Sequence, residues 1–459
     1  MYPRRKFLAG LAGAGAALLG PQVKRNHWLA AAERVRDKIR ITEIERHEIY
    51  LPYHKFNAQD LFRYHGYRIQ ANTVLIVRTN VGLVGAGQSW GVYNVTDEQR
   101  RKYIGMSPFD GLAARSDLPF NMAMYDLMGK YLDVPAWKLI GEQVRDRIPV
   151  AAWTASFTPK KMAAEVKHAA SLGYQWLKYH IDETQNVIDQ TRAMQAAAPP
   201  GFRIHYDFNG NSHREAIEPV LDTLRKFPIV GRVEDPISTA KPDDWRYFCD
   251  KYDFPIVAHH APVDFIVNGA ADGYMAGHAP IGSAMQIAGV AEQVNKPIML
   301  QQAGTYINQA FLAHEASVFP TATMDQVNLS ELWTEHVTNE TMPIQDGSIA
   351  VPDGPGLGVT VNLEKLNHLA QRPRPQQTPF LVRLVYKGGP TIVSRHTPGI
   401  EGHTDDMRML SRLLGQKQNL PGPTPGYIND VRADWWDDVD DPAWQKAWRA
   451  TENKKYVLV

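Results

Sequence analysis

The sequence is 459 residues long, carries a formal net charge of +1, and contains 44% hydrophobic and 22% charged residues. These values argue against a disordered chain, a polytopic membrane protein and a disulfide-stapled scaffold. The balanced charge gives no reason to expect nucleic acid or an anionic membrane as a partner. The single cysteine, Cys249, permits neither an internal disulfide nor a cysteine-based zinc site.

The first 20 residues differ in composition from the rest of the chain. Arg4-Arg5-Lys6 precedes a 13-residue apolar run, Phe7 to Leu19, which is shorter than the ~20 apolar residues that a membrane-spanning helix needs. A basic start before a short apolar core is typical of a signal peptide, and the string through Leu8 resembles the twin-arginine export motif. We expect residues 1–37 to be an export signal and linker, and the protein to be periplasmic or extracellular. A disordered tail is the alternative.

Residues 38–141 predict an α+β domain. Alternation of apolar and polar residues indicates strands, and a loop rich in aromatic residues and histidine, 53–68, separates the first two. The expected elements are strands at 40–51, 71–79 and 81–87 and a clear helix at 118–132.

Residues 142–343 alternate short apolar runs with amphipathic helices, which predicts a parallel (β/α) barrel. A doubly wound open sheet is the alternative, but no glycine-rich phosphate loop follows the first strand. The link at 261–270 is too short for a full helix. The expected strands are 148–153, 176–180, 203–207, 229–234, 254–258, 271–275, 297–301 and 327–332, and the expected helices are 159–171, 184–198, 212–226, 241–252, 282–295 and 305–318.

Two further segments follow the predicted barrel. Residues 344–369 are rich in turns and close the domain, and residues 370–459 form a C-terminal extension of unknown role. The extension predicts a hairpin at 380–386 and 391–395. Its four tryptophans between 435 and 448 indicate packing against a neighbouring surface, with a partner interface as the alternative.

Polar residues that end the predicted strands suggest where the chemistry lies, because the active site of a parallel barrel forms at the carboxyl ends of its strands. Asp207, Glu234 and His260 end three consecutive strands and are 27 and 26 residues apart, one βα unit each. Oxygen ligands suit Mg²⁺ or Mn²⁺, whereas an imidazole shifts the preference toward transition metals. Helix capping by these side chains is the alternative, and the choice between His259 and His260 stays open.

Lys178 and His180 are two residues apart on one predicted strand, so both face the barrel interior. A buried lysine near a metal has a lowered pKa through desolvation and like charge, which suits a base that removes a proton next to a carboxylate. A structural ion pair between Lys178 and one of the ligand carboxylates is the alternative reading.

These motifs resemble those of the enolase superfamily, in the branch of mandelate racemase and muconate lactonising enzyme. The resemblance covers about residues 38–369, and the order and spacing of its motifs make it specific. The matching pieces are Leu118–Pro135 and Leu139-Ile140-Gly141 at the end of the capping domain, Asp207-Phe208-Asn209, Glu234-Asp235-Pro236, and Pro355–Val359 after the barrel.

The resemblance implies an α/β fold, a (β/α) barrel of the enolase type with an N-terminal α+β capping domain that closes over the barrel mouth. It implies a divalent metal, Mg²⁺ in most of the family, that holds a substrate carboxylate and stabilises the enediolate formed when a base removes the α-proton. Members include racemases, cycloisomerases and sugar-acid dehydratases, act on small carboxylates and often form homo-oligomers.

The sequence departs from the family pattern in four places. His259-His260 stands where the third acidic ligand is usual, which makes Mn²⁺, Fe²⁺ or Zn²⁺ more competitive. The strand-two motif is Lys178-Tyr179-His180 rather than two lysines. Strands six and seven end in His278 and Gln301, so the Asp–His pair of the racemases is missing. The segment between strands five and six is shortened.

We therefore expect a metal-dependent lyase that dehydrates a hydroxy acid such as a sugar acid. In this hypothesis Lys178 removes the α-proton, and His180 or His278 protonates the leaving hydroxyl. The expected substrate-binding residues are Arg63, His65, Asn209, Gln301 and Glu335, although Glu335 also fits a surface helix. A racemase or epimerase that uses His278, and a non-catalytic binding protein that keeps the barrel, are the alternatives.

Overall fold

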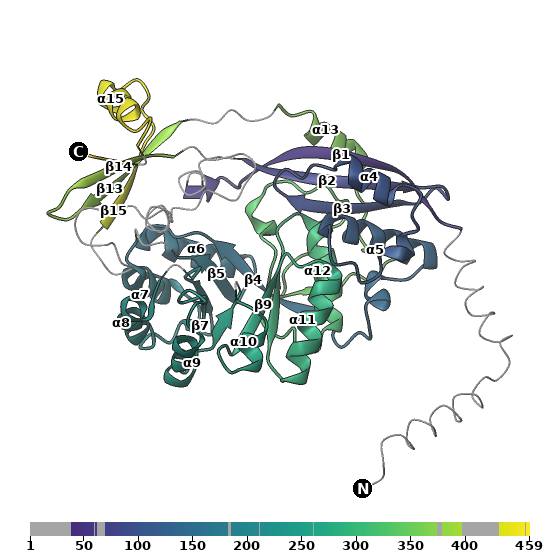
Figure 1. Ribbon diagram of the computed structural model, residues 1–459, viewed down its shortest axis with the longest axis horizontal. Coiled ribbons are helices and arrows are strands. Elements are labelled where there is room, and N and C mark those ends of the chain that lie inside the picture. The colour runs from purple at the N-terminus through teal and green to yellow at the C-terminus, as the bar shows by residue number, and fades with distance from the viewer. Residues whose placement is uncertain are drawn as a thin grey trace, which may run out of the picture.

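The computed structural model describes residues 38–58, 60–61, 69–181, 185–210, 212–259, 261–373, 379–396, 431–454 and 456–459. Figure 1 shows three bodies: an N-terminal sheet with its helices, a central barrel, and a small C-terminal sheet on the far side from the first. The predicted export signal lies outside the described residues. Within them, no helix is both long enough and apolar enough to cross a membrane.

The N-terminal body is an antiparallel sheet in the order β1-β2-β3, packed on one face by a helix. The helix, α5, is Leu118–Leu132, as predicted; it starts with a proline in its first turn and buries eleven of its fifteen residues. The strands are β1 (Ile41–Pro52), β2 (Ile69–Thr79) and β3 (Val84–Trp90), and a short helix α4 (Asp97–Tyr103) follows them.

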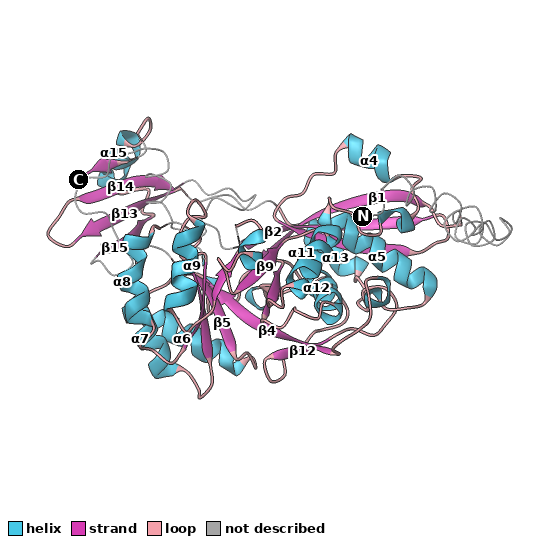
Figure 2. Ribbon diagram, turned by 60° about the horizontal axis from the view of Figure 1, so that its bottom comes forward, coloured by secondary structure: helices cyan, strands magenta, loops and turns pink. Residues whose placement is uncertain are grey.

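Eight parallel strands form the central barrel, which closes where the last strand pairs with the first. Figure 2 shows the surrounding helices in cyan. The strands are β4 (Arg147–Thr154), β5 (Trp176–His180), β6 (Arg203–Asp207), β7 (Val230–Glu234), β8 (Ile256–Ala258), β9 (Gly273–Gly277), β10 (Ile298–Gln301) and β11 (Gln326–Val327). The helices are α6 (Pro159–Ser171), α7 (Val187–Ala197), α8 (Arg214–Leu224), α9 (Pro242–Lys251), α10 (Asp264–Val267), α11 (Ile281–Gln293) and α12 (Tyr306–Val318).

Most strands differ from their predicted bounds by one to three residues, and two of the differences bear on the candidate site. The sixth strand ends at Gly277 rather than at 275, which brings His278 directly to its carboxyl end. The eighth was expected at 327–332 but stops at Val327, because Leu329 adopts a left-handed φ of 67° that no strand tolerates. Residues Ser330–Leu332 form a 3₁₀ turn instead.

The segment after the barrel returns to the N-terminal sheet. Strand β12 (Ser348–Ala350) pairs antiparallel with the start of β4, and helix α13 (Leu363–Ala370) packs on β1. Between them Gly356 has a φ of 71°, and a Cβ there would lie 2.3 Å from Asp126 Oδ1. Glycine is therefore required for the turn and for the hydrogen bond, 3.0 Å long, from the Leu357 amide to that buried carboxylate.

The C-terminal body is a four-stranded antiparallel sheet in the order β15-β13-β14-β16. Its strands are β13 (Phe380–Tyr386), β14 (Thr391–His396), β15 (Val431–Trp436) and β16 (Val457–Leu458), and helix α15 (Pro442–Ala450) covers one face. On that helix Trp444 and Trp448 stack with ring centroids 4.8 Å apart. These tryptophans pack within the C-terminal body itself.

Candidate active site

Three neighbouring strands of the barrel bring their polar ends to one edge. The parallel register pairs His180 with Asp207 and Asp207 with Glu234. Because side chains alternate along a strand, Lys178 and His180 on β5, Asp207 on β6 and Glu234 on β7 all face the barrel interior. The structure thus brings together four residues that the sequence placed on three separate strands.

Lys178 lies at the centre of this cluster and is fully buried. Its Nζ atom is 3.1 Å from Asp207 Oδ2, and 2.9 and 2.8 Å from the two carboxylate oxygens of Glu234. It also donates a 2.9 Å hydrogen bond to Gln301 Oε1 from β10. Gln301 therefore contacts the lysine.

The expected lowering of the Lys178 pKa was argued for a lysine beside a metal, and it stays a prediction. Burial by itself lowers the pKa of the ammonium, but Asp207 and Glu234 outweigh burial and raise it. Burial likewise opposes the charge of Glu234, but Lys178 and two histidines hold the pKa of its carboxyl well below the usual range. Lys178 is thus ion-paired with both predicted ligands.

His259, which follows β8, completes the cluster. Its Nδ1 atom lies 3.1 Å from Glu234 Oε1, and its backbone amide donates a 2.8 Å hydrogen bond to Asp235 Oδ1. Room for the ring comes from Gly277 on β9, where a Cβ would lie 2.1 Å from His259 Nε2. The histidine of this pair that the sequence predicted as a ligand, His260, lies outside the described residues.

Sequence reasoning missed two members of the cluster, His205 and Asp235. His205 is fully buried on β6, and its Nε2 atom lies 2.7 Å from Glu234 Oε2. Burial lowers the His205 pKa to about 3 and, together with the nearby Glu234 and Asp207, raises the pKa of Asp235 to about 7. The signal for His205 was its position two residues before Asp207, which directs it to the same interior.

Backbone strain is concentrated at the strand ends that form this edge. Asn209, Asp235, His278 and Leu329 follow β6, β7, β9 and β11, and have φ angles of 56°, 43°, 49° and 67°. Residues other than glycine rarely adopt such angles, and they persist where the surrounding structure imposes them, often at functional sites.

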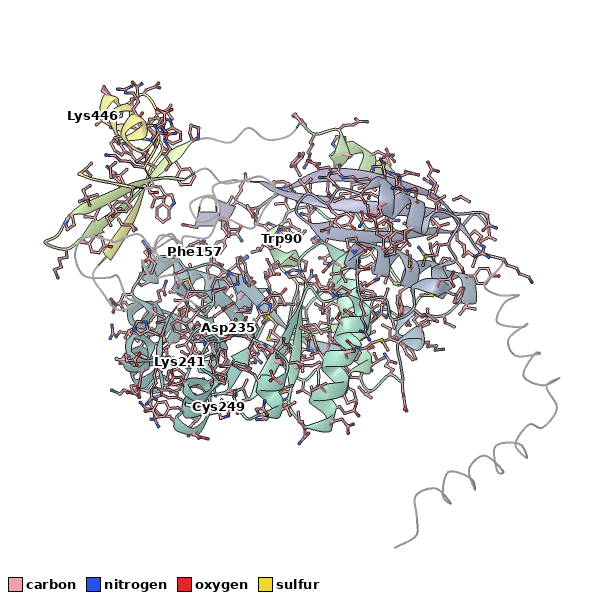
Figure 3. The ribbon with its side chains drawn as sticks, viewed as in Figure 1. Trp90, Phe157, Asp235, Lys241, Cys249 and Lys446 are labelled. Atoms are coloured by element: carbon pink, nitrogen blue, oxygen red, sulfur yellow. The ribbon has the colours of Figure 1, made fainter. Side chains whose placement is uncertain are left out.

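Two histidines border the cluster on its open side. His180 Nε2 lies 3.3 Å from Asp207 Oδ2, its side chain is 20% exposed, and its ring meets the edge of Trp153. His278 stacks on Trp90 of β3 with ring centroids 6.2 Å apart. Figure 3 places Trp90 where the N-terminal body meets the barrel, and Asp235 within the barrel.

The remaining predicted substrate residues have different environments. Asn209 is bonded within its own turn, with its amide N–H 2.9 Å from Asp207 Oδ1. Glu335 forms a two-point ion pair with Arg372, 2.5 and 3.1 Å long, away from the cluster. The carboxylate that is buried after β11 is Glu331, which accepts a 2.7 Å hydrogen bond from the Trp153 amide. Arg63 and His65 lie outside the described residues.

The cluster fits a divalent cation. One ligand atom each from Glu234, Asp235 and His259 lies within 4.8 Å of the others, and Asp207 joins Glu234 through their shared contacts with Lys178. Carboxylates with one imidazole are ligands for Mg²⁺, Mn²⁺ and other first-row metals.

Comparison with known proteins gives a consistent result. The model of the family described as enolase C-terminal domain-like matches residues 161–366. The chain is 24% identical over 345 residues to D-xylonate dehydratase of Haloferax volcanii, which covers 63% of this chain and 82% of that protein.

Two solved structures share the fold. The muconate lactonizing enzyme from Pseudomonas putida superimposes with a TM-score of 0.60 and 20% identity over 72% of this chain and 99% of its own. An enolase from Pseudomonas fluorescens with bound magnesium, potassium and tartrate gives a TM-score of 0.60 and 18% identity over 72% of this chain and 92% of its own.

Proposed function

We propose that this chain, which belongs to the mandelate racemase and muconate lactonising enzyme branch of the enolase superfamily, is a metal-dependent dehydratase of a hydroxylated carboxylic acid of the sugar-acid class. The observation that carries the proposal is the cluster at the carboxyl ends of β6 to β8, where the buried carboxylates of Asp207 and Glu234 share Lys178 and His259 contacts Glu234. The similarity to a D-xylonate dehydratase supports the substrate class.

In this proposal Asp207, Glu234 and His259 hold the cation. When bound, a divalent metal supplies positive charge for the substrate carboxylate and for the negative charge that develops when the α-proton leaves. Lys178 has no exposed surface and contacts both carboxylates, so its role is to hold these ligands rather than to touch the substrate. This assignment differs from the expectation that Lys178 is the base.

We assign the removal of the α-proton to the imidazole of His180, which is 20% exposed and is oriented by Asp207. His278 protonates the hydroxyl on the neighbouring carbon, which then leaves as water. The C–H and C–O bonds break, a C=C bond forms, and the resulting enol becomes a 2-keto acid. Trp90 stacks on one face of the His278 ring, with the ring centroids 6.2 Å apart.

The test is α-proton exchange in D₂O over a library of five- and six-carbon aldonic acids, with the full chain loaded with Mg²⁺ or Mn²⁺. We expect deuterium incorporation or loss of water with at least one acid. Inversion without loss of water would replace the proposal with an epimerase. No bound metal and no exchange with any acid would replace it with a binding protein.

A matched pair of variants tests the base. His180→Asn is expected to lower the exchange rate by about 10²–10⁴-fold, the range typical of a lost general base. His368→Asn is the control, because this histidine is exposed on α13, far from the cluster. An unchanged exchange rate in His180→Asn would remove the assignment.

A further inference from the structure

The barrel interior holds polar side chains both at the proposed metal-binding edge and in the layer below that edge. The register pairs Lys178 with His205 and His205 with Arg232, one layer beneath the pairs that His180 and Asp207 form. His205 has no exposed surface and Arg232 has 4%. Parallel barrels usually fill this interior with branched apolar side chains, so these polar residues require a reason.

Arg232 is accounted for by its own partners. Its guanidinium forms a hydrogen-bonded ion pair with Asp325, which directly precedes β11, and lies 3.9 Å from the centre of the Trp176 ring. The floor of the barrel is therefore closed by a pair of opposite charges. The Arg232 guanidinium is held by Asp325 at the floor, and among the described contacts it makes no ion pair with Glu234.

His205 has no such partner below it. Its Nε2 atom points to Glu234 Oε2 at 2.7 Å, an oxygen that also lies 2.8 Å from Lys178 Nζ, and within the described residues neither ring nitrogen has a completed hydrogen bond to any other group. Buried polar groups without partners are unfavourable, and a leucine of similar size would avoid the penalty. The imidazole therefore serves the carboxylate above it rather than the packing of the barrel.

The two oxygens of Glu234 have different neighbours. Both oxygens lie within 2.9 Å of Lys178 Nζ, but Oε1 also lies 3.1 Å from Nδ1 of the proposed ligand His259, whereas Oε2 lies 2.7 Å from His205 Nε2. A hydrogen bond to one carboxylate oxygen fixes the orientation of the other, and such supporting contacts typically change metal affinity 10–100-fold.

We propose that His205 is a positioning residue that holds Glu234 Oε2 from beneath, so that Oε1 stays directed at the cation. The inference rests on the proposed function, in which Glu234 is a metal ligand. The nitrogen at the tip of the ring, Nε2, reaches the carboxylate, so the length of the side chain matters as much as its polarity.

Three substitutions of His205 separate the effect of side-chain length from the effect of the hydrogen-bond donor. In His205→Gln an amide N–H occupies nearly the place of Nε2, in His205→Asn the amide is one carbon shorter, and His205→Leu has no donor. His314→Leu is the control, because His314 is equally buried, on α12, and its Nε2 contacts Leu357 O at 3.1 Å.

Calorimetric titration of Mn²⁺ into the metal-stripped full chain measures the affinity, and the Mn²⁺ resonance spectrum reports the ligand environment. We expect His205→Gln to bind within about threefold of the unmodified chain, and His205→Asn and His205→Leu to bind 10–100-fold more weakly with an altered spectrum. His314→Leu is expected to lower the melting temperature without changing the affinity.

The measured affinities separate a failure of the inference about His205 from a failure of the proposed function. If the unmodified chain binds Mn²⁺ and His205→Asn binds it equally well, the inference is overturned while the proposed function stands. The same holds if His205→Gln and His205→Asn weaken binding equally. If the unmodified chain binds no Mn²⁺, the proposed function fails first.

Discussion

The two ends of the barrel interior differ in the ratio of buried negative to buried positive side chains. At the floor one carboxylate, Asp325, faces one guanidinium, Arg232. At the mouth two carboxylates, Asp207 and Glu234, contact a single lysine, and a third carboxyl group, that of Asp235, lies close to both. Burial is similar at both ends, so burial alone does not mark a functional site; an excess of one charge does, because buried charges persist only when they are paired or bind a metal.

Substitution of Glu234 has the largest expected effect at the mouth. Glu234→Gln removes the charge that Lys178, His205 and His259 share, and we expect it to weaken metal binding more than 100-fold, measured as metal content after dialysis and by Mn²⁺ titration. Asp325→Asn, the analogous change at the floor, is expected to leave metal content unchanged. Unchanged metal content in Glu234→Gln would contradict the assignment of Glu234 as a ligand.

The floor pair is expected to matter for stability instead. Asp325→Asn leaves the Arg232 guanidinium buried without its counter-charge, and breaking a buried ion pair costs about 3–5 kcal/mol. Thermal and denaturant unfolding measure the loss. A stability change below about 1 kcal/mol would mean that the floor pair is as replaceable as a surface pair.

Glu165 on α6 shows how a buried carboxyl behaves outside this cluster, beside one lysine. It is 4% exposed, lies 3.1 Å from Lys161, and has a pKa that burial raises to about 7 from the ordinary value of 4.5. The folded state therefore binds the proton more tightly than the unfolded state, so this group's contribution to stability falls as the pH rises from about 4.5 to about 7.

Glu165→Gln is therefore expected to stabilise the chain at pH 8 by up to about 3 kcal/mol, since 2.5 pKa units correspond to that energy. Near pH 4.5 the gain should vanish. Melting temperatures of both proteins across this range measure the difference, and a constant offset at all pH values would show that the proton is not the cause.

The smallest effect is expected for substitution of Glu335, which pairs with Arg372 outside the cluster. Glu335 and Arg372 are both about a quarter exposed, and pairs of this kind contribute between 0 and about 1 kcal/mol. Glu335→Gln should leave proton exchange and metal content unchanged. A loss of exchange in this variant would return Glu335 to the site, where the sequence had placed it.

Much of the fold could be predicted from the chain itself. The helix at 118–132 and the strands at 176–180 and 203–207 have the predicted bounds, because each is set by a local pattern of apolar residues. The eighth strand could not be predicted, since Leu329 takes its left-handed backbone from its surroundings. Side chains from α12 bond to Asn328 and Ser330 on both sides of it.

The candidate site, like the fold, has features that the sequence predicts and features that it does not. The spacing of Asp207 and Glu234, one βα unit apart, is written in the sequence and follows from the period of the fold. The partners of Lys178, the inward place of His259 and the contact of His205 with Glu234 arise between strands. They depend on register and barrel closure, which bring distant residues within 3 Å and which no local pattern of residues encodes.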